Sequence, residues 1–438
     1  MLRNPSSAKI KDIRGKDSYN TPAELKDRIV ASLRSKSVPI HKSTIQAHQV
    51  QKRRLSDSTD SAVDVNSPEK RVESQFPAVD PVNSPDNILN GTKGESTDKS
   101  HSDEITDPVL STVRSIPTVI LYDESGLELF DAITGLEEYY LTNAEADILK
   151  KHSQDIVTSI VPKSAGTIKW IELGVGSMKK LEPFLASISS HSSEKTEYFA
   201  LDVSDVSLNA CLAPLHDKFH KHIDFIGLQG TYEDAVALLP QISGQKCVMW
   251  LGSSIGNFTR DEAESFLSSL TRNLAPGDFI LLGVDAINPG TLVKNAYCDS
   301  QGVTRDFILN GLKHVNSLFV ANAFDETAWE YISVFNQAQG RHEAYYESLI
   351  EQELKLDDET IQMKKGEWIH VEYSVKYNPE DLVKMGRRLG WSLVNSWKTD
   401  VGRNDITGTY GMYLFQLPSE PNFGVPSLKE WDDLWHKW

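Results

Sequence analysis

The sequence predicts an α/β fold with a doubly wound parallel sheet. Between residues 166 and 285, five short apolar runs alternate with amphipathic stretches, and each run ends in small or polar residues. Strand, helix and strand repeated in this way imply right-handed crossovers between parallel strands. Because ligands of such sheets bind beyond the carboxyl ends of the strands, the residues after each run form the candidate site. The runs are Ile168–Leu173, Tyr198–Val203, Ile223–Leu228, Cys247–Leu251 and Phe279–Val284.

The segments around these runs complete the sheet. Thr259 is placed to cap a helix over Arg260–Leu274. Near the C-terminus, a helix followed by two strand patterns closes the sheet as a hairpin. The predicted core domain therefore consists of residues 166–285 and 378–417. The closing helix and strands are Pro379–Leu389, Ser392–Trp397 and Gly411–Gln416.

The alternation stops after Asp285 for about 90 residues. A doubly wound sheet does not need this segment, so residues 286–377 are predicted as an inserted α+β cap. The segment carries a helical pattern at Thr304–Leu318 and strand patterns at Arg341–Ser348 and Trp368–Tyr377.

Residues 1–110 are predicted as a disordered tail, because Ser, Thr, Asp, Lys and Pro dominate and aromatic residues are scarce. One helical pattern stands out in this tail. It begins at Thr21 as the cap, has Pro22 in its first turn, and carries an apolar stripe. The stripe consists of Leu25, Ile29 and Leu33.

Three other segments flank the core and cap. The basic cluster at residues 52–54 is interpreted as a solvated charge run, with a nuclear localisation signal as the weaker alternative. Residues 111–165 are predicted to be a helical part of the substrate-binding region. The segment at 418–438 is a tryptophan-rich tail with a helical pattern.

The composition indicates which classes of partner and which cellular compartment to expect. The chain has 438 residues and a formal charge of −17, which argues against nucleic acid or an anionic membrane as the main partner. It has no apolar run long enough for a membrane span and no apolar segment of a secretory signal at its start. The three cysteines, Cys211, Cys247 and Cys298, are far apart and suit reduced thiols rather than a metal site. We therefore expect a cytoplasmic enzyme, monomeric and without a metal, that acts on a small molecule.

The strand ends carry residue types that suit a nucleoside cofactor. The first run ends in a Gly-x-Gly turn at Gly174 and Gly176, where the backbone can approach a ligand closely. Lys179 stands where dinucleotide-binding motifs have a third glycine, which counts against NAD. The second run ends at Asp202, whose carboxylate suits ribose hydroxyls, with a helix-capping role as the alternative. After the third run, Tyr232 is placed to pack beside an adenine.

Several longer motifs resemble the histidine-specific Nα-methyltransferase family, which makes hercynine (trimethylhistidine) for ergothioneine. A fungal branch of this family N-methylates dimethylallyltryptophan instead. The resemblance runs in colinear order over residues 111–417 and implies a Rossmann-like S-adenosylmethionine methyltransferase with a substrate-binding cap. The matching segments are 121–134, 138–145, 172–176, 252–257, 295–297, 340–343 and 372–377.

The resemblance also implies which residues hold each ligand. The positions that match the family's S-adenosylmethionine site are Gly174, Gly176, Lys180, Asp202, Thr231, Tyr232 and Gly252. The positions that match its amino-acid site are Tyr122, Tyr139, Asn257, Tyr297, Glu372 and Ser374. Of these, Tyr122 and Asn257 are the expected catalytic residues.

The residue types suit methyl transfer to an amine. Asn257 can donate to an α-carboxylate and accept from an α-amine, and Tyr297 can add a second bond to the carboxylate. Glu372 and Ser374 are two positions apart, so on a strand they share one face and can grip both nitrogens of an imidazole. A buried carboxylate facing an indole would be poorly paired, so Glu372 favours histidine over dimethylallyltryptophan.

Three alternatives stay open, and one departure from the family is visible. The alternatives are a methyltransferase of a tryptophan derivative, a degenerate binding protein, and a nicotinamide-dependent reductase. Typical fungal relatives continue into an iron-dependent sulfoxide synthase domain, but this sequence has no His-x-x-x-His-x-Glu motif. We therefore expect only the first step of the pathway. The three histidines at 216, 220 and 222 are interpreted as a solvated helix end.

Overall fold

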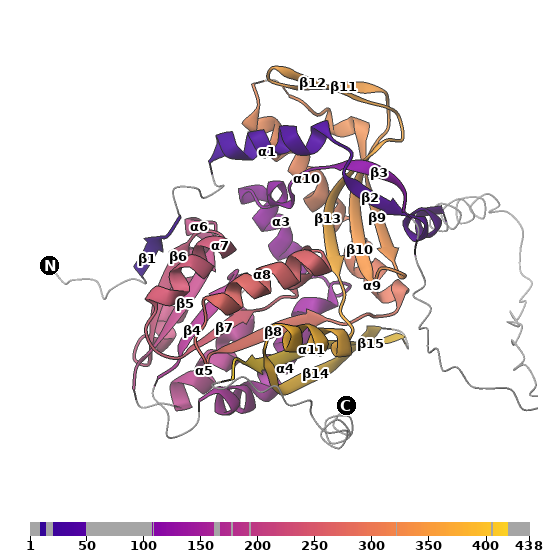
Figure 1. Ribbon diagram of the computed structural model, residues 1–438. Coiled ribbons are helices and arrows are strands. Elements are labelled where there is room, and N and C mark those ends of the chain that lie inside the picture. The colour runs from indigo at the N-terminus through magenta and orange to yellow at the C-terminus, as the bar shows by residue number, and fades with distance from the viewer. Residues whose placement is uncertain are drawn as a thin grey trace, which may run out of the picture.

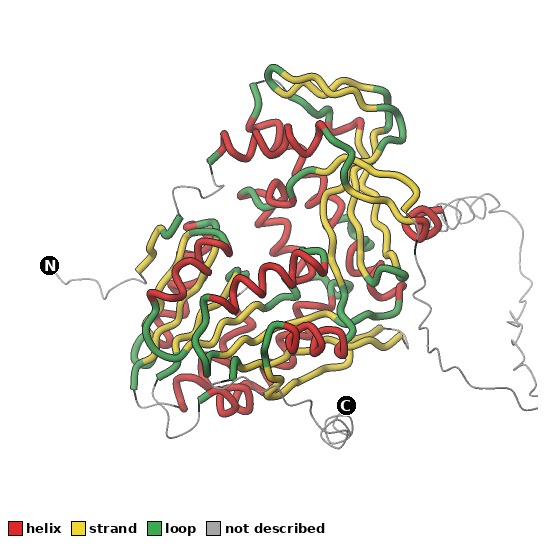
Figure 2. Tube along the Cα trace, in the orientation of Figure 1, coloured by secondary structure: helices red, strands yellow, loops and turns green. Residues whose placement is uncertain are grey.

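The computed structural model contains two main sheets, one below the other in Figure 1, with helices packed around them. Figure 2 shows that helices lie on both sides of the strands of the lower sheet. The structure describes residues 9–14, 21–49, 107, 109–161, 167–176, 178–191, 194–320, 322–403 and 406–418.

The five apolar runs form five parallel strands in the lower sheet, which confirms the doubly wound prediction. The strands are β4 (Lys169–Leu173), β5 (Thr196–Asp202), β6 (Ile223–Gln229), β7 (Lys246–Trp250) and β8 (Phe279–Asp285). Their order in the sheet is β6-β5-β4-β7-β8. The order reverses between β4 and β7, and this switch point is where ligands bind in such sheets.

A C-terminal hairpin extends the same sheet, as predicted. It consists of β14 (Ser392–Arg403) and β15 (Ile406–Gln416), and β15 pairs antiparallel with β8. Both strands extend beyond the predicted ranges, Ser392–Trp397 and Gly411–Gln416. Residues Lys398–Arg403 continue the hydrogen-bonded pairing between them.

Helices cover both faces of this sheet. Neighbouring residues on a strand point to opposite faces, so Trp170 packs in one core and Ile171 in the other. A capping box between Thr259 and Glu262 starts α8 at the expected position. The first face is covered by α4 (Tyr140–Ile160), α5 (Glu182–His191) and α6 (Asp205–Phe219), and the second by α7 (Tyr232–Leu238), α8 (Arg260–Arg272) and α11 (Pro379–Arg388).

The upper sheet forms the cap. Its strands, in spatial order, are β2 (Val38–His41), β3 (Val109–Ser115), β13 (Trp368–Val375), β10 (Arg341–Ser348) and β9 (Trp329–Asn336). The helices α3 (Glu124–Thr134), α9 (Gly290–Tyr297) and α10 (Val303–Leu318) and the hairpin of β11 (Gln352–Leu356) and β12 (Glu359–Met363) complete it. Two of the five strands thus come from upstream of the expected cap at residues 286–377.

The prediction of a disordered tail over residues 1–110 is wrong for residues 9–12, 22–34, 38–41 and 42–49, which form strands and helices. The four-residue strand β1 (Lys9–Asp12) pairs in parallel with β6 and forms the edge of the lower sheet. The helix α1 (Pro22–Arg34) has the expected Thr21 cap, with Glu24 completing a capping box. The polar composition of β1 and α1 does not predict these elements, because β1 has one half-buried apolar residue, Ile10, and α1 buries only Ile29 and Leu33.

The N-terminal segment reaches both sheets. In Figure 1, β1 lies at the edge of the lower sheet, whereas α1 lies beneath the β11–β12 hairpin of the cap. Ion pairs join Lys26 to Asp357 and Arg34 to Glu359. The basic cluster at residues 52–54 and residues 419–438 of the tryptophan-rich tail lie outside the described residues. Among the residues that the structure does describe, no helix has the length and apolarity that crossing a bilayer requires.

Candidate active site

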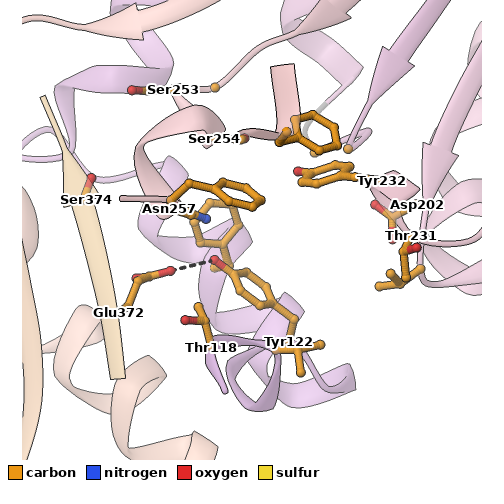
Figure 3. A pocket seen from close by; sticks show the side chains of 18 of the residues that line it. Thr118, Tyr122, Asp202, Thr231, Tyr232, Ser253, Ser254, Asn257, Glu372 and Ser374 are labelled. Carbon is orange, nitrogen blue, oxygen red and sulfur yellow. Dashed lines mark hydrogen bonds between the residues drawn. The ribbon is translucent and has the colours of Figure 1, made fainter. Parts of the chain in front are cut away.

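A cavity of about 1390 Å³ lies between the carboxyl ends of the parallel strands and the cap. All the site residues predicted from the sequence line it, except Lys180. Figure 3 shows Asp202, Thr231 and Tyr232 on one side of the cavity and Tyr122, Asn257, Glu372 and Ser374 toward the other. The residues that the resemblance assigns to the cofactor and those that it assigns to the amino acid thus line different parts of one cavity.

The turn after β4 brings bare backbone to the cavity wall. Gly174 has φ of +80° and Gly176 has φ of +45°, a region that favours glycine. A Cβ on residue 174 would lie 3.2 Å from the Tyr232 hydroxyl, whereas one on residue 176 would meet nothing within 4 Å. A side chain at position 174 would therefore intrude on the wall that Tyr232 forms.

Asp202 ends β5 with its carboxylate at the cavity. Its Oδ1 accepts a hydrogen bond from the Ser204 backbone N–H at 2.9 Å. Burial raises the pKa of this carboxyl, and backbone hydrogen bonds oppose the shift. The cap of α6 is Ser204, whose side chain accepts from Ser207. The helix-capping alternative for Asp202 is therefore wrong.

The third strand end supplies an aromatic wall. The Tyr232 ring lies against Trp250, Phe258 and Phe266, with centroid distances of 5.5, 6.3 and 5.8 Å. Neighbouring Thr231 lines the cavity too, but its side chain caps α7 through Asp234. Tyr232 thus offers a flat apolar surface, whereas the Thr231 hydroxyl is already used by the helix.

Lys180 takes a different place from the other predicted residues. Its Nζ lies 2.6 Å from Oε1 of Glu145, a fully buried carboxylate on α4. Oε2 of Glu145 accepts hydrogen bonds from the Gly252 backbone N–H at 2.7 Å and the Tyr410 hydroxyl at 2.6 Å. A Cβ on Gly252 would lie 3.7 Å from the Lys180 ammonium. Lys180 therefore supports the loop after β7 through Glu145 in this structure.

The part of the cavity around Glu372 contains a hydrogen bond between distant segments. Tyr122 follows the 3₁₀ turn η1 (Thr118–Leu121), and its hydroxyl donates to Oε1 of Glu372 at 3.3 Å. Burial raises the pKa of Glu372 to about 7, although the Tyr122 hydrogen bond and the Lys376 charge act in the other direction. Glu372 thus titrates near neutrality.

Two hydroxyls stand beside Glu372. The Tyr297 Oη and the Ser374 Oγ are 2.6 Å apart. The ammonium of Lys376 donates to Tyr297 at 2.7 Å and to Ser374 at 3.0 Å, and it forms an ion pair with Asp285 at 2.7 Å. Ser374 and Tyr297 line the cavity, whereas Lys376 and Asp285 are fully buried behind them.

Asn257 and Tyr139 complete this part of the wall. Asn257 ends the 3₁₀ turn η4 (Ser254–Asn257), which follows Ser253 in the left-handed region at φ 57°. Within this turn, a Cβ on Gly256 would lie only 2.7 Å from the Val375 carbonyl oxygen, so the turn packs tightly on β13. The Tyr139 ring meets Tyr297 edge-on at a centroid distance of 5.9 Å.

Sequence reasoning missed four polar residues around the site. Glu145, Asp285 and Lys376 are fully buried, and His342 stacks on the Tyr297 ring at 4.3 Å. Burial and the Lys376 charge lower the pKa of His342 well below its usual value. Asp285 ends an apolar run, like Asp202, and that position was an available signal. Glu145 and Lys376 lie in ordinary helix and strand patterns, so only their three-dimensional contacts reveal them.

The sequence also leads us to interpret the three histidines at 216, 220 and 222 as a helix end rather than a metal site. His216 and His220 stack at the end of α6 with centroids 5.5 Å apart, and His220 bonds to backbone carbonyls there. Within the described residues, no group of three histidine, cysteine, aspartate or glutamate side chains is arranged to hold a metal ion.

Comparison with known proteins gives the family. Residues 101–407 match the model of the "Histidine-specific methyltransferase, SAM-dependent" family. Ergothioneine biosynthesis protein 1 of Neurospora crassa is 36% identical over 343 residues, which cover 74% of this chain and 37% of that protein. The protein of the same name in Schizosaccharomyces pombe is 34% identical over 332 residues, covering 74% of this chain and 42% of that protein.

A shorter relative is similar over most of its length. Histidine N-alpha-methyltransferase of Mycobacterium tuberculosis is 30% identical over 293 residues, which cover 66% of this chain and 88% of that protein. The chain thus spans less than half of the two fungal relatives but matches nearly all of the mycobacterial one. The colinear motifs, the strand order and the family match agree. This chain belongs to the family of S-adenosylmethionine-dependent, histidine-specific methyltransferases.

Proposed function

We propose that this chain transfers methyl groups from S-adenosylmethionine to the α-amino nitrogen of free histidine, giving hercynine as the first step of ergothioneine biosynthesis. The pair formed by Glu372 and Ser374 carries the substrate assignment. Both side chains line the cavity from one face of β13. A neutral imidazole has one N–H donor and one nitrogen acceptor, which a carboxylate and a hydroxyl complement.

The strand ends fit the methyl donor. The glycines at 174 and 176 leave the backbone open to a nucleoside, Asp202 offers a carboxylate to ribose hydroxyls, and Tyr232 offers a flat wall. When bound, S-adenosylmethionine would supply the methyl carbon of a sulfonium; the lone pair of an amine attacks this carbon in line, and the sulfur leaves as a neutral thioether. The chain's own task is to hold the amine in that line and to keep water away from it.

The residues on the opposite side would orient the amino acid. The Asn257 amide can donate to the α-carboxylate and accept from the α-amine at the same time. The Tyr122 hydroxyl donates its hydrogen bond to Glu372, so its oxygen keeps lone pairs that can accept from an N–H of the amine. In this proposal Asn257 and Tyr122 hold the amine as a neutral group with its lone pair directed at the methyl carbon.

Another aromatic amino acid could enter the same cavity, and the hydrogen-bonding groups of Glu372 and Ser374 discriminate between the two substrates. An indole offers one N–H to Glu372 but no acceptor, so the Ser374 hydroxyl would lose the partner that the second imidazole nitrogen supplies. We therefore place dimethylallyltryptophan and related amino acids second.

The test is the mass of the products. The chain is incubated with S-adenosylmethionine and either histidine or dimethylallyltryptophan, and we expect mono-, di- and trimethyl species from histidine. Turnover of dimethylallyltryptophan together with inert histidine would overturn the substrate assignment. A calorimetric titration without S-adenosylmethionine binding would instead favour a degenerate binding protein.

The charge and the cysteine content support the proposed class of substrate and the proposed location. The excess of 62 acidic over 45 basic residues supports a small-molecule substrate rather than nucleic acid. The three cysteines are free thiols, which supports a reducing cytoplasmic location. We infer a monomer, and sedimentation analysis of the purified chain tests this.

A further inference from the structure

The ion pair between Lys376 and Asp285 lies directly behind the substrate side of the cavity. Both side chains are 0% exposed, and neither lines the cavity. Burying two charges costs free energy that their attraction alone does not always return. The pair also joins the two sheets, since Asp285 ends β8 in the lower sheet and Lys376 directly follows β13 in the cap.

The neighbours of Asp285 fix the pair in place. Its Oδ2 accepts from the Tyr140 hydroxyl at 2.8 Å as well as from Lys376. Its Oδ1 accepts from the Asn288 amide at 2.8 Å. The Asp285 backbone is held too, because its N–H donates to the Ser253 hydroxyl at 3.0 Å. The anion therefore has little freedom, and it holds the lysine ammonium in one position.

The three N–H groups of the Lys376 ammonium are then all used. One faces Asp285, one donates to the Tyr297 oxygen and one to the Ser374 oxygen. No lysine proton is left for a ligand. The lysine acts on the cavity only through these two hydroxyls.

Counting protons and lone pairs shows what the hydroxyls present. Each hydroxyl has one proton and two lone pairs, and the 2.6 Å contact between Tyr297 and Ser374 uses one of the two protons. The hydroxyl that accepts this bond also accepts from Lys376, so both its lone pairs are filled. Its own proton is then the one left for the cavity. The hydroxyl that donates keeps one lone pair, so the pair presents one proton and one lone pair, whichever hydroxyl donates to the other.

We propose that Lys376 is a positioning residue that, anchored by Asp285, makes the Tyr297–Ser374 pair a hydrogen-bond donor toward the amino-acid substrate. This inference rests on the proposed function for the identity of the substrate. A donor at this point suits a carboxylate oxygen or the unprotonated imidazole nitrogen, both of which are acceptors. Without the ammonium, the same hydroxyls could turn their protons inward and offer lone pairs instead.

Two variants separate binding from folding. Lys376→Met leaves Asp285 buried without its partner, which is destabilising by itself. Lys376→Met combined with Asp285→Asn removes both charges and keeps an amide that Tyr140 and Asn288 can contact. We expect the double variant to regain thermal stability but to keep a KM for histidine raised by about tenfold or more, the worth of a hydrogen bond to a charged group. The Kd for S-adenosylmethionine should stay within about twofold of wild type.

A double-mutant cycle tests whether the lysine acts through the hydroxyls. In a Tyr297→Phe background, Lys376→Met should raise the KM for histidine by less than about threefold, because one of its two targets is already gone. A full effect in that background would overturn the inference. A parallel loss of S-adenosylmethionine affinity would also overturn it, since that would indicate general damage.

The chain offers a matched control. Lys246 at the start of β7 forms a buried ion pair with Asp278 at 3.2 Å, at the end of the sheet away from the cavity. Lys246→Met should lower stability and leave the KM for histidine unchanged, and an equal rise in KM there would refute a specific role for Lys376. Wild-type chain that fails to methylate histidine would refute the proposed function instead. The Lys376 variants would then be compared on the amino acid that the wild type does methylate.

Discussion

The Tyr122 hydroxyl donates a hydrogen bond to the Glu372 carboxylate across 3.3 Å, although the two residues are 250 positions apart. Tyr122 precedes α3, and Glu372 lies on the central strand β13 of the cap. In the proposed function, Tyr122 contacts the amine and Glu372 contacts the imidazole. The bond therefore fixes the separation between the two ends of the substrate.

The first prediction concerns substrate binding by Glu372. Glu372→Ala removes the acceptor for the imidazole N–H and leaves Tyr122 without its partner, so kcat/KM for histidine should fall by roughly a hundredfold. Glu372→Gln keeps an acceptor oxygen and should lose less. Product mass spectrometry at several histidine concentrations measures both, and wild-type turnover in Glu372→Ala would contradict the assignment.

The second prediction concerns pH. Because burial raises the pKa of Glu372 to about 7, the carboxylate gains a proton as the pH falls through 7 and loses its capacity as a two-oxygen acceptor. The kcat/KM of the wild type should therefore decline below pH 7. Glu372→Gln has no such group, so it should keep only the declines that come from the substrate itself, through the α-amine and the imidazole (near pH 6.5), and should lack the additional decline near pH 7. Identical pH profiles for the two enzymes would exclude this role of Glu372.

The same shift has a consequence for stability. Between pH 4.5 and about 7, the folded chain keeps a proton on Glu372 that the unfolded chain has lost. The contribution of this group to the free energy of unfolding therefore decreases as the pH rises through that window. Thermal melts across the window should show a smaller decrease for Glu372→Gln than for the wild type.

The third prediction concerns the Gly-x-Gly turn. Gly174→Ala places a methyl group 3.2 Å from the Tyr232 hydroxyl at φ +80°, so both the turn and the cavity wall must shift. We expect a loss of S-adenosylmethionine affinity of about tenfold or more in a calorimetric titration. Gly366→Ala is the control, because Gly366 has φ +78° but nothing within 4 Å of its Cβ. It should cost about 1 kcal/mol of stability and leave cofactor affinity unchanged.

The fourth prediction concerns the N-terminal segment. The Thr44 hydroxyl donates to the buried Glu343 carboxylate at 2.9 Å and accepts from the Asn336 amide at 2.9 Å. Thr44→Val removes both bonds while keeping the shape, and should lower the free energy of unfolding by about 1–3 kcal/mol. Thr158→Val, on the exposed face of α4, is the matched control and should cost less than about 0.5 kcal/mol. Equal melting temperatures for the two variants would argue against a structural role for Thr44.

The strand ends of the lower sheet could be predicted from the sequence because local patterns encode them. The runs that form β7 and β8 are buried on both faces, so they differ clearly from their amphipathic neighbours. Small and acidic residues after the runs, such as Gly174 and Asp202, then mark the switch point. The resemblance to the family added the cap residues Tyr297 and Glu372, which no local pattern distinguishes.

The remaining features depend on contacts between distant segments. The strand β1 has the sequence Lys-Ile-Lys-Asp, which shows no periodicity and is specified only by pairing with β6. Lys376 looks like a surface residue by composition, and its burial follows from meeting Asp285 across two sheets. The sequence also does not show that Lys180 forms an ion pair with Glu145, because Glu145 lies on α4, far from Lys180 along the chain.

The pairing of β1 with β6 has a practical consequence for anyone who shortens this chain. A fragment cut to the range of the family match would begin at residue 101 and would lack β1. The backbone N–H and C=O groups of β6 that now bond to residues 9–12 would then face solvent along an apolar strand. Such an open edge recruits strands from other molecules, so the truncated protein should aggregate where the full chain stays dispersed.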